Sequence, residues 1–383
     1  METLNVLTFI KYLPDDIRAG GGEITMWNTV RGLSERGHKI SAVICNPDRR
    51  LPCIPNVEYY ITPPYRNRRP LDFKTSAYWL SKSIKIKPDI IHSFYAESFA
   101  TNFYGHGKSI PVVQEIHYAD LYPYTFRDMI AYPKRVSGFL WACHLRIAKI
   151  AAGYADVVVT PSRYMKTKLI ETFNLSGEKI VVIPVGVNED VFTNGKIKNR
   201  FDRPTRLLFV GRLVKEKGLD TLLQAFSNVL KTDRGVYLTI IGDGPLRGEY
   251  ETLARKLSVQ SNTRFIGWIT REKVLDYVKN SHMLIVPSVK ENFPRITLEA
   301  MGAGIPVIAS SVGGIPEQIT DGVDGVIIPP ENPQKLANAI LSLFSKPEKM
   351  MDMSREGVKT AATFTIKRKI ESFEGLYRRI ISS

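Results

Sequence analysis

The stretch "SHMLIVPSVKENFPRITLEAMGAGIPVIAS", residues 281–310, indicates the fold because it combines two strands with a helix between them. Its ends, "SHMLIVPS" and "IPVIAS", are short apolar runs of the kind found in strands that are buried on both faces. Pro294 suits the first turn of a helix, and Gly304 marks the point where that helix stops. We therefore expect a helix over residues 294–303 with a strand on either side of it.

The same alternation of apolar runs and amphipathic segments continues along the whole chain. Segments such as "ITMWNTVRGLSERGH" and "SRYMKTKLIETFN" have the apolar spacing of helices. Near-continuous apolar strands separated by helices indicate an α/β fold, with a parallel sheet that helices cover on both faces. The expected strands are residues 4–10, 39–45, 88–94, 110–117, 155–162, 180–186, 206–213, 236–244, 263–269, 281–288, 305–310 and 325–330.

The 383 residues exceed the usual size of one domain, and the pattern restarts after a polar, linker-like segment at residues 189–206. We expect a first doubly wound, Rossmann-like domain over residues 1–190 and a second over residues 191–365. The amphipathic tail, residues 366–383, is expected to be a helix that packs back on the first domain. In such sheets ligands bind beyond the carboxyl ends of the strands, so two facing domains would form a cleft.

The composition suggests an anionic partner and a reducing compartment. The chain has 53 Lys and Arg against 38 Asp and Glu, which suits a phosphate-bearing ligand, a nucleic acid or an acidic membrane surface. Its three cysteines form no disulfide framework and show no zinc-binding spacing. The start lacks the features of a signal peptide, and no apolar run is long enough to span a bilayer. We expect a cytoplasmic protein that can lie at the inner face of the cytoplasmic membrane.

Two loops that follow predicted strands could hold an anion. The run "GGG", residues 20–22, precedes a predicted helix, where backbone N–H groups and the helix dipole attract negative charge. Arg212 and Lys217 flank a turn before another helix, where two cations could clamp a diphosphate. A flexible turn and a solvated surface pair are the alternatives. Neither loop matches G-x-G-x-x-G or G-K-[ST], which argues against dinucleotide and nucleotide triphosphatase loops.

Glu291 and Glu299 lie on either side of the helix start in the opening stretch. Eight residues at about 1.5 Å each place them about 12 Å apart, whereas a cooperating acid–base pair needs roughly 5–9 Å. The spacing suits two carboxylates that bind opposite ends of one elongated ligand, with a hexose at Glu291, a ribose at Glu299 and a diphosphate between them. A helix-start acid and a solvated acid are the alternative.

Several motifs occur in an order that resembles one known family. They are "GGGE" at residues 20–23, "GRLVKEKG" from Gly211, "GDGP" from Gly242, the E-x7-E from Glu291 to Glu299, "EAMGAGIPVIAS" and "GGIPEQITDG". Over nearly the whole chain they resemble the GT-B family of retaining, nucleotide-sugar-dependent glycosyltransferases called family four, or glycosyl transferases group 1. The resemblance implies a GT-B fold, in which two doubly wound Rossmann-like domains face each other across a cleft.

The resemblance also implies roles for individual residues. Arg212 and Lys217 would bind the donor diphosphate, Glu299 the ribose and Glu291 the transferred sugar. His117, in "VVQEIHYAD", would touch that sugar near the reacting carbon; from the residues alone, a core or loop histidine is the alternative. The implied catalytic residues are His117, Arg212, Lys217 and Glu291. The implied donor-binding residues are Gly21, Gly22, Gly211, Arg212, Lys217, Glu291, Asn292, Phe293, Pro294, Arg295 and Glu299.

Two positions depart from the family pattern. Asn292 stands where many relatives have glycine, and "PVGVNED", residues 184–190, replaces a common Asn-Gly-Val-Asp. The role of that second loop is therefore open, although an interdomain hinge is still expected at Gly186.

The resemblance implies a retaining transfer from a UDP- or GDP-linked sugar, with no metal and no cofactor. The acceptor would attack the front face of the sugar and pass its proton to the leaving phosphate. The nearest acidic pair to a metal site is Asp15 with Asp16, and it is not well placed for one. The acceptor would be a saccharide or a polyprenyl- or other lipid-linked molecule, as in the synthesis of cell-envelope glycans.

Three basic segments of the first half also carry aromatic or apolar residues: residues 65–70, 81–87 and 132–151. They could hold the protein on an anionic membrane, or they could be solvated faces beside a core helix. Two other classes compete: a nucleotide-sugar epimerase of GT-B fold and a basic nucleic-acid-binding protein. We expect no nucleic acid partner, because the basic residues are spread over both halves without an RRM, KH or zinc pattern.

Overall fold

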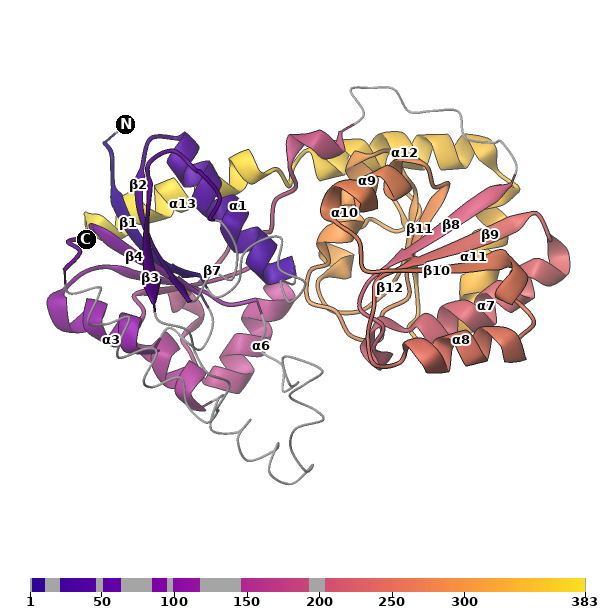
Figure 1. Ribbon diagram of the computed structural model, residues 1–383, viewed down its shortest axis with the longest axis horizontal. Coiled ribbons are helices and arrows are strands. Elements are labelled where there is room, and N and C mark those ends of the chain that lie inside the picture. The colour runs from indigo at the N-terminus through magenta and orange to yellow at the C-terminus, as the bar shows by residue number, and fades with distance from the viewer. Residues whose placement is uncertain are drawn as a thin grey trace. The chain divides into compact units, whose positions relative to one another are not determined.

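The computed structural model describes residues 2–10, 21–45, 51–62, 85–94, 99–117, 146–192 and 204–382. The chain forms two compact units: the first consists of Met1–Val185 and Ile366–Ser383, and the second of Gly186–Thr365. Each unit has one parallel sheet with helices (Figure 1). The expected boundary after residue 190 falls inside the second unit, because residues 189–191 pack against a helix of that unit.

The first unit contains a sheet of seven parallel strands in the order β3-β2-β1-β4-β5-β6-β7. β1 pairs with both β2 and β4, so the direction in which strands are added reverses beside β1. A doubly wound sheet is expected to have such a reversal near its centre. The strands are β1 (Asn5–Ile10), β2 (Lys39–Cys45), β3 (Val57–Thr62), β4 (Ile90–Phe94), β5 (Val112–Glu115), β6 (Val157–Thr160) and β7 (Ile180–Val182).

Helices cover both faces of this sheet (Figure 1). They are α1 (Gly21–Glu35), α3 (Phe99–Lys108), a helix at residues 146–154, α6 (Arg163–Phe173) and α13 (Ile366–Ile381). Successive residues of β1 point to opposite faces, as the pleat of a strand requires. Val6 and Ile10 belong to the core formed with α1 and α13, whereas Leu7 and Phe9 belong to the core formed with α6.

Helix α6 shows how local residues set the limits of a helix. The side chain of Ser162 accepts a hydrogen bond from the N–H of Met165, which caps the first turn. Asn174 adopts the left-handed conformation, with φ of 54°, and ends the helix. Between them Met165, Leu169 and Phe173 are buried, at the spacing that places them on one face.

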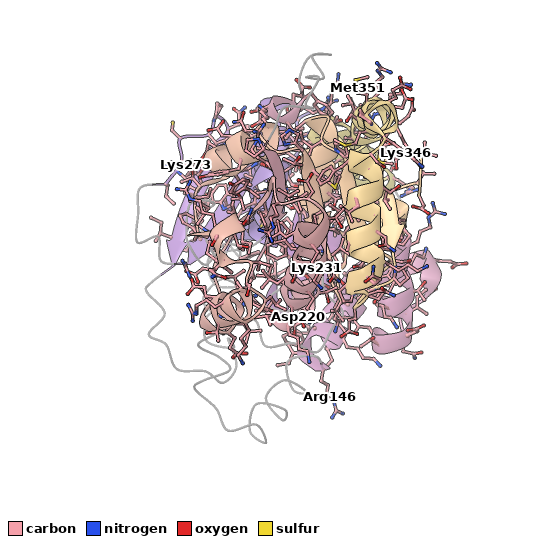
Figure 2. All side chains as sticks on the ribbon, turned by 90° about the vertical axis from the view of Figure 1, so that its right-hand side faces the viewer. Arg146, Asp220, Lys231, Lys273, Lys346 and Met351 are labelled. Carbon is pink, nitrogen blue, oxygen red and sulfur yellow. The ribbon has the colours of Figure 1, made fainter. Side chains whose placement is uncertain are left out.

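The second unit contains a sheet of six parallel strands in the order β10-β9-β8-β11-β12-β13. Its strands are β8 (Thr205–Val210), β9 (Val236–Ile241), β10 (Thr263–Gly267), β11 (Met283–Val286), β12 (Val307–Ser310) and β13 (Val326–Ile328). Its helices are α7 (Leu219–Thr232), α8 (Arg247–Lys256), α9 (Arg271–Lys279), α10 (Arg295–Gly302), α11 (Pro333–Phe344) and α12 (Pro347–Ala361). Here β8 lies between β9 and β11, so the order reverses between β8 and β11. Asp220 and Lys231 lie in the first and last turns of α7 (Figure 2), where their charges complement the helix dipole.

The C-terminal helix α13 belongs to the first unit and packs on α1 (Figure 1). The two helices approach closely at Gly32, where a Cβ atom would lie 2.6 Å from the side chain of Ile370. Phe373 and Tyr377 of α13 are fully buried. Glu374 accepts a hydrogen bond from Arg36, in the turn that follows α1, with the Nε–Oε1 distance at 2.7 Å. The chain thus returns to the first unit to complete its core.

The structure differs from the sequence-based expectations at three local points. β3 was missed, because its residues are half-buried or exposed at the edge of the sheet and do not form a continuous apolar run. Helix α1 begins at Gly21, so Gly21 and Gly22 form its first turn and do not precede it. Helix α10 begins one residue later than expected: Pro294 has an extended backbone, with ψ of 119°, and serves as the N-cap.

Candidate functional site

The loops that follow β8 and β11 lie against each other at the carboxyl edge of the second sheet. Gly218, in the β8 loop, has φ of +64°, and a Cβ atom there would lie 2.0 Å from the carbonyl oxygen of Pro287. The N–H of Val289 donates to the carbonyl of Glu216 at 2.9 Å, which joins the two loops a second time. These loops flank the point where the strand order reverses, the usual ligand site of such sheets.

The joined loops bring Lys217 and Glu291 into contact. The Nζ of Lys217 forms an ion pair with Oε2 of Glu291, and both side chains are partly buried. Ser288 Oγ lies 3.4 Å from the same carboxylate oxygen. Sequence reasoning assigned these residues separate roles and did not predict their pairing. Side by side, an ammonium and a carboxylate offer donors and acceptors to one polar ligand.

The loop after β12 supports the backbone of Glu291. Gly313 has φ of +59°, and a Cβ atom there would lie 1.6 Å from the carbonyl oxygen of Glu291. The N–H of Gly314 donates to the carbonyl of Asn292 at 2.7 Å. Only glycine fits such an approach, so the Gly-Gly pair holds the segment before α10 in place.

Arg212 lies on the β8 loop in an exposed position, and Gly211 before it is half-buried. The β9 loop fixes this backbone: Gly242 has φ of +126°, and a Cβ atom there would lie 1.9 Å from the carbonyl oxygen of Gly211. The N–H of Leu213 also donates to the carbonyl of Asp243 at 2.9 Å. The guanidinium of Arg212 is therefore accessible to an anion while its backbone is held on both sides.

Glu299 of α10 is buried, so the alternative of a solvated acid is wrong. Its Oε1 lies 3.2 Å from Nε of Arg271 and 3.2 Å from Nε of Arg295. Arg271 also binds both carboxylate oxygens of Asp190, at 2.9 and 3.1 Å. Burial lowers the pKa of Arg295, and its Nη1 is buried with no hydrogen-bond partner in the described ranges. Sequence reasoning missed Arg271 as a partner of this carboxylate, and it missed Asp190 as the second carboxylate that Arg271 binds.

The segment that leads into α10 is also firmly held. Phe293 and Pro294 are buried, and the side-chain amide of Gln318 donates to the carbonyl of Pro294 at 3.1 Å. The ring of Phe293 contacts that of Phe364, with centroids 5.9 Å apart. The first turn of α10 therefore presents its N–H groups from a fixed position, which suits a negatively charged ligand.

His117, in the first unit, lies just after β5 and is 8% exposed. Its Nε2 is 2.6 Å from Oε1 of Glu115, the last residue of β5. The same oxygen accepts a hydrogen bond from Nζ of Lys369 in α13 at 2.8 Å. Burial opposes the charge of Glu115, but Lys369 and then His117 outweigh it and hold the pKa of the carboxyl well below its usual value.

The contact of Glu115 with His117 could be expected from the sequence, whereas its contact with Lys369 could not. Glu115 lies two residues before His117 at the end of a strand, so both side chains can reach the same face. Lys369 comes from the far end of the chain and could not be paired with Glu115 from spacing.

Several predicted features lie outside the described residues. They are Gly20, the Asp15–Asp16 pair, the basic segment 65–70 and most of segment 132–151. Within the ranges that the structure does describe, no cluster of three or more His, Cys, Asp or Glu is placed to hold a metal ion. In those same ranges, no helix is both long and apolar enough to cross a membrane.

Both halves of the chain match known families. Residues 19–191 match the model described as Glycosyltransferase Family 4, and residues 190–360 match the model described as Glycosyl transferases group 1. An uncharacterized glycosyltransferase of Methanocaldococcus jannaschii is 34% identical over 190 residues, 47% of this chain and 48% of that protein. A D-inositol 3-phosphate glycosyltransferase of Corynebacterium aurimucosum is 28% identical over 243 residues, 60% of this chain and 58% of that protein. The chain thus matches about half the length of these curated relatives.

Solved structures match nearly the whole length of the chain. Sucrose-phosphate synthase from Thermosynechococcus elongatus matches with a TM-score of 0.78 at 20% identity, over 99% of each chain. HepE of Anabaena, solved in complex with UDP-glucose, matches with a TM-score of 0.73 at 18% identity, over 98% of this chain and 100% of that chain. With the two parallel sheets, these likenesses confirm the predicted GT-B fold of two Rossmann-like α/β domains.

Proposed function

We propose, from the premise that this chain belongs to the group 1 glycosyltransferases of family four, that it transfers a hexose from a nucleotide-diphosphate sugar to a hydroxyl group. The observation that carries the proposal is the set of interlocked loops at the carboxyl edge of the second sheet. They gather Arg212, Lys217, Glu291 and the first turn of α10 on a rigid backbone. Cations and helix N–H groups beside a carboxylate suit a ligand with an anionic centre and a hydroxyl-rich end.

In this proposal Arg212 and Lys217 bind the diphosphate and stabilise the charge that develops on it as the bond to the sugar breaks. Arg212 can bind it through two parallel hydrogen bonds, and Lys217 contributes a point charge. Fixed donors aimed at a developing negative charge are among the strongest catalytic devices known in enzymes. The N–H groups in the first turn of α10, which begins at Arg295, add to this field.

Glu291 then accepts hydrogen bonds from the hydroxyls of the transferred sugar, and Glu299 accepts from the ribose. Arg271 and Arg295 both contact Oε1 of Glu299, so Oε2 is the atom proposed to face the ribose. Gly22, buried at the start of α1, would let the first unit approach the donor through backbone N–H groups. His117 would contact the sugar near its reacting carbon.

The transfer is proposed to retain the configuration of the sugar and to need no metal. The bond between the anomeric carbon and the phosphate oxygen breaks while the acceptor oxygen bonds to that carbon from the same face. The acceptor proton passes to the departing phosphate oxygen, so no protein carboxylate forms a covalent intermediate. The donor is UDP- or GDP-linked; the complex of HepE with UDP-glucose supports the first of these.

The acceptor is proposed to be a saccharide or a lipid-linked molecule, with the basic surface of the first domain near an anionic membrane. Support comes from the net charge of +15 and the basic segments of the first half. Flotation with anionic vesicles at low salt tests the membrane part, and absence of binding would contradict it. The epimerase and nucleic-acid alternatives are not favoured, because both family matches are to glycosyltransferases.

A thermal-shift screen of nucleotide sugars tests the proposal directly, because a donor that binds the native state raises its melting temperature. Arg212→Ala and Lys217→Ala should each lower turnover by roughly tenfold or more without unfolding the protein. Lys215→Ala is the matched control, since Lys215 is an exposed cation on the same turn. Normal turnover in both test variants would refute their assignment. Activity that fails in a chelator and returns with Mg²⁺ would refute metal independence.

A further inference from the structure

A buried group of ionisable side chains surrounds His117 in the first unit, and its other members have no role in the transfer described above. Glu115 stands at its centre, with Oε1 2.6 Å from Nε2 of His117 and 2.8 Å from Nζ of Lys369. Its Oε2 lies 3.3 Å from Nε2 of His92, and Nδ1 of His92 lies 2.6 Å from the hydroxyl of Tyr377. Apart from His117, each of these side chains is almost completely shielded from water.

The contact with Glu115 requires a proton on Nε2 of His117. An ionised carboxylate can only accept hydrogen bonds, so Nε2 of His117 must be the donor to Glu115. In the neutral ring this leaves Nδ1 as the acceptor. Glu115 remains ionised because the ammonium of Lys369 lies against it, which holds the pKa of the carboxyl well below its usual value despite burial.

Two further neighbours of Glu115, His92 and Tyr377, do not supply that charge. Burial lowers the pKa of His92, which keeps its ring neutral. Burial also raises the pKa of Tyr377 well above its usual value, so this hydroxyl stays protonated. Lys369 is therefore the resident cation that balances Glu115 among the described residues, and it lies in the first turn of α13.

We propose that Lys369 is a positioning residue: it keeps Glu115 ionised, and Glu115 holds the ring of His117 as the Nε2–H tautomer, in the orientation in which His117 meets the transferred sugar. The sugar contact rests on the proposed function, whereas the tautomer does not. Stability alone does not account for the pair, because replacing a buried ion pair with apolar groups is commonly neutral or stabilising. In this view α13 returns to the first unit to deliver a charge as well as to complete its core.

The tautomer can be measured by NMR on the full-length protein with ¹⁵N-labelled histidine. Two-bond ¹H–¹⁵N correlations distinguish Nε2–H from Nδ1–H rings, and a His117→Gln variant identifies its signals among the six histidines. Wild type should show the Nε2–H form. Lys369→Met should abolish that preference, because Glu115 without its cation takes up a proton and can then donate. Lys367→Met, which removes an exposed lysine two positions earlier in α13, should leave the spectrum unchanged.

Turnover supplies a second readout. Lys369→Met should lower kcat by about tenfold to a hundredfold through misplacement of His117. The melting-temperature rise caused by UDP, which lacks the transferred sugar, should stay as in wild type. If the single variant fails to fold, the double variant Glu115→Gln with Lys369→Met removes both charges together and should fold. Its amide can donate or accept, so it should also lose the tautomer preference.

The two proposals fail in different ways. Wild-type tautomer signals that persist in Lys369→Met, or in the double variant, would overturn the positioning role. Absence of any melting-temperature response to nucleotide sugars in wild type would overturn the proposed function and leave the tautomer result standing.

Discussion

Gly313→Ala is expected to disturb the loop that carries Glu291. The added Cβ atom would lie 1.6 Å from the carbonyl oxygen of Glu291 and 2.6 Å from its carbonyl carbon. Both are backbone atoms and cannot turn aside as a flexible side chain can. The loop must therefore move by roughly 1.5 Å to restore a normal contact distance. That movement would displace Glu291 from Lys217 and from any bound sugar.

The loss of folding stability expected for Gly313→Ala has two parts. Placing an alanine in the left-handed conformation lowers the free energy of unfolding by roughly 1–2 kcal/mol. The contact with Glu291 adds about 1–3 kcal/mol, the usual effect of forcing extra atoms into a packed site. Gly322→Ala is the matched control: its φ is +75°, but nothing lies within 4 Å of the added atom. The control should therefore lose only the first part, and Gly313→Ala should lose both.

Urea unfolding followed by circular dichroism measures the free energy of unfolding of each variant. Steady-state turnover with the donor found in the thermal-shift screen measures the site. We expect kcat/KM to fall by about tenfold to a hundredfold in Gly313→Ala and to stay unchanged in Gly322→Ala. Equal losses of stability in the two variants, with equal kcat/KM, would refute the inference that the β12 loop holds the Glu291 backbone.

Two further predictions concern charge and packing. Hydrogen bonds from Arg271 hold the pKa of Asp190 below its ordinary value of 3.8. The stability that this pair contributes is therefore fully present above pH 3.8, and it is lost as the pH falls through the lower pKa of the folded state. The difference in urea midpoint between wild type and Asp190→Asn should be constant above about pH 5 and shrink below pH 3.8; a difference that grows on acidification would contradict the pairing. Gly32→Ala should lower the free energy of unfolding by about 1–3 kcal/mol, because its Cβ atom would crowd Ile370. Gly375→Ala in α13 has open space around the added atom, so it should raise the free energy of unfolding by up to about 1 kcal/mol. Thermal unfolding of both variants checks the opposite signs.

The fold was predictable because the same physical pattern occurs twice along the chain. Strands buried on both faces must be apolar throughout, so the runs at residues 281–288 and 305–310, which contain the fully buried β11 and β12, were recognisable from the sequence. β3 was missed although the other three edge strands, β7, β10 and β13, were expected. Its Glu58 and Ile61 are exposed, which removes the continuous apolar signal on which recognition of the other strands depended.

Parts of the candidate site were predictable for a related reason. A loop position that needs both a positive φ and a close backbone contact is usually occupied by glycine. The glycines at 218 and 313 therefore mark loops in which another part of the backbone can approach closely. What touches each of them could not be read, because the contact lies in another loop. The pairing of Lys217 with Glu291 depends on contact between the loops that follow β8 and β11, and spacing along the chain does not predict that contact.

The carboxylates of the candidate site share one property that motif reading did not reveal: each is matched by a cation from a distant segment. Glu291 pairs with Lys217, Glu299 with Arg271, and Glu115 with Lys369. Removing one member of a buried pair leaves the other charge uncompensated, which is more destabilising than removing both. Loss of activity after substituting any one of these acids therefore does not by itself show that the acid touches substrate. Double variants that remove both members of a pair separate the two explanations, because only a substrate contact is still missing once the charges balance.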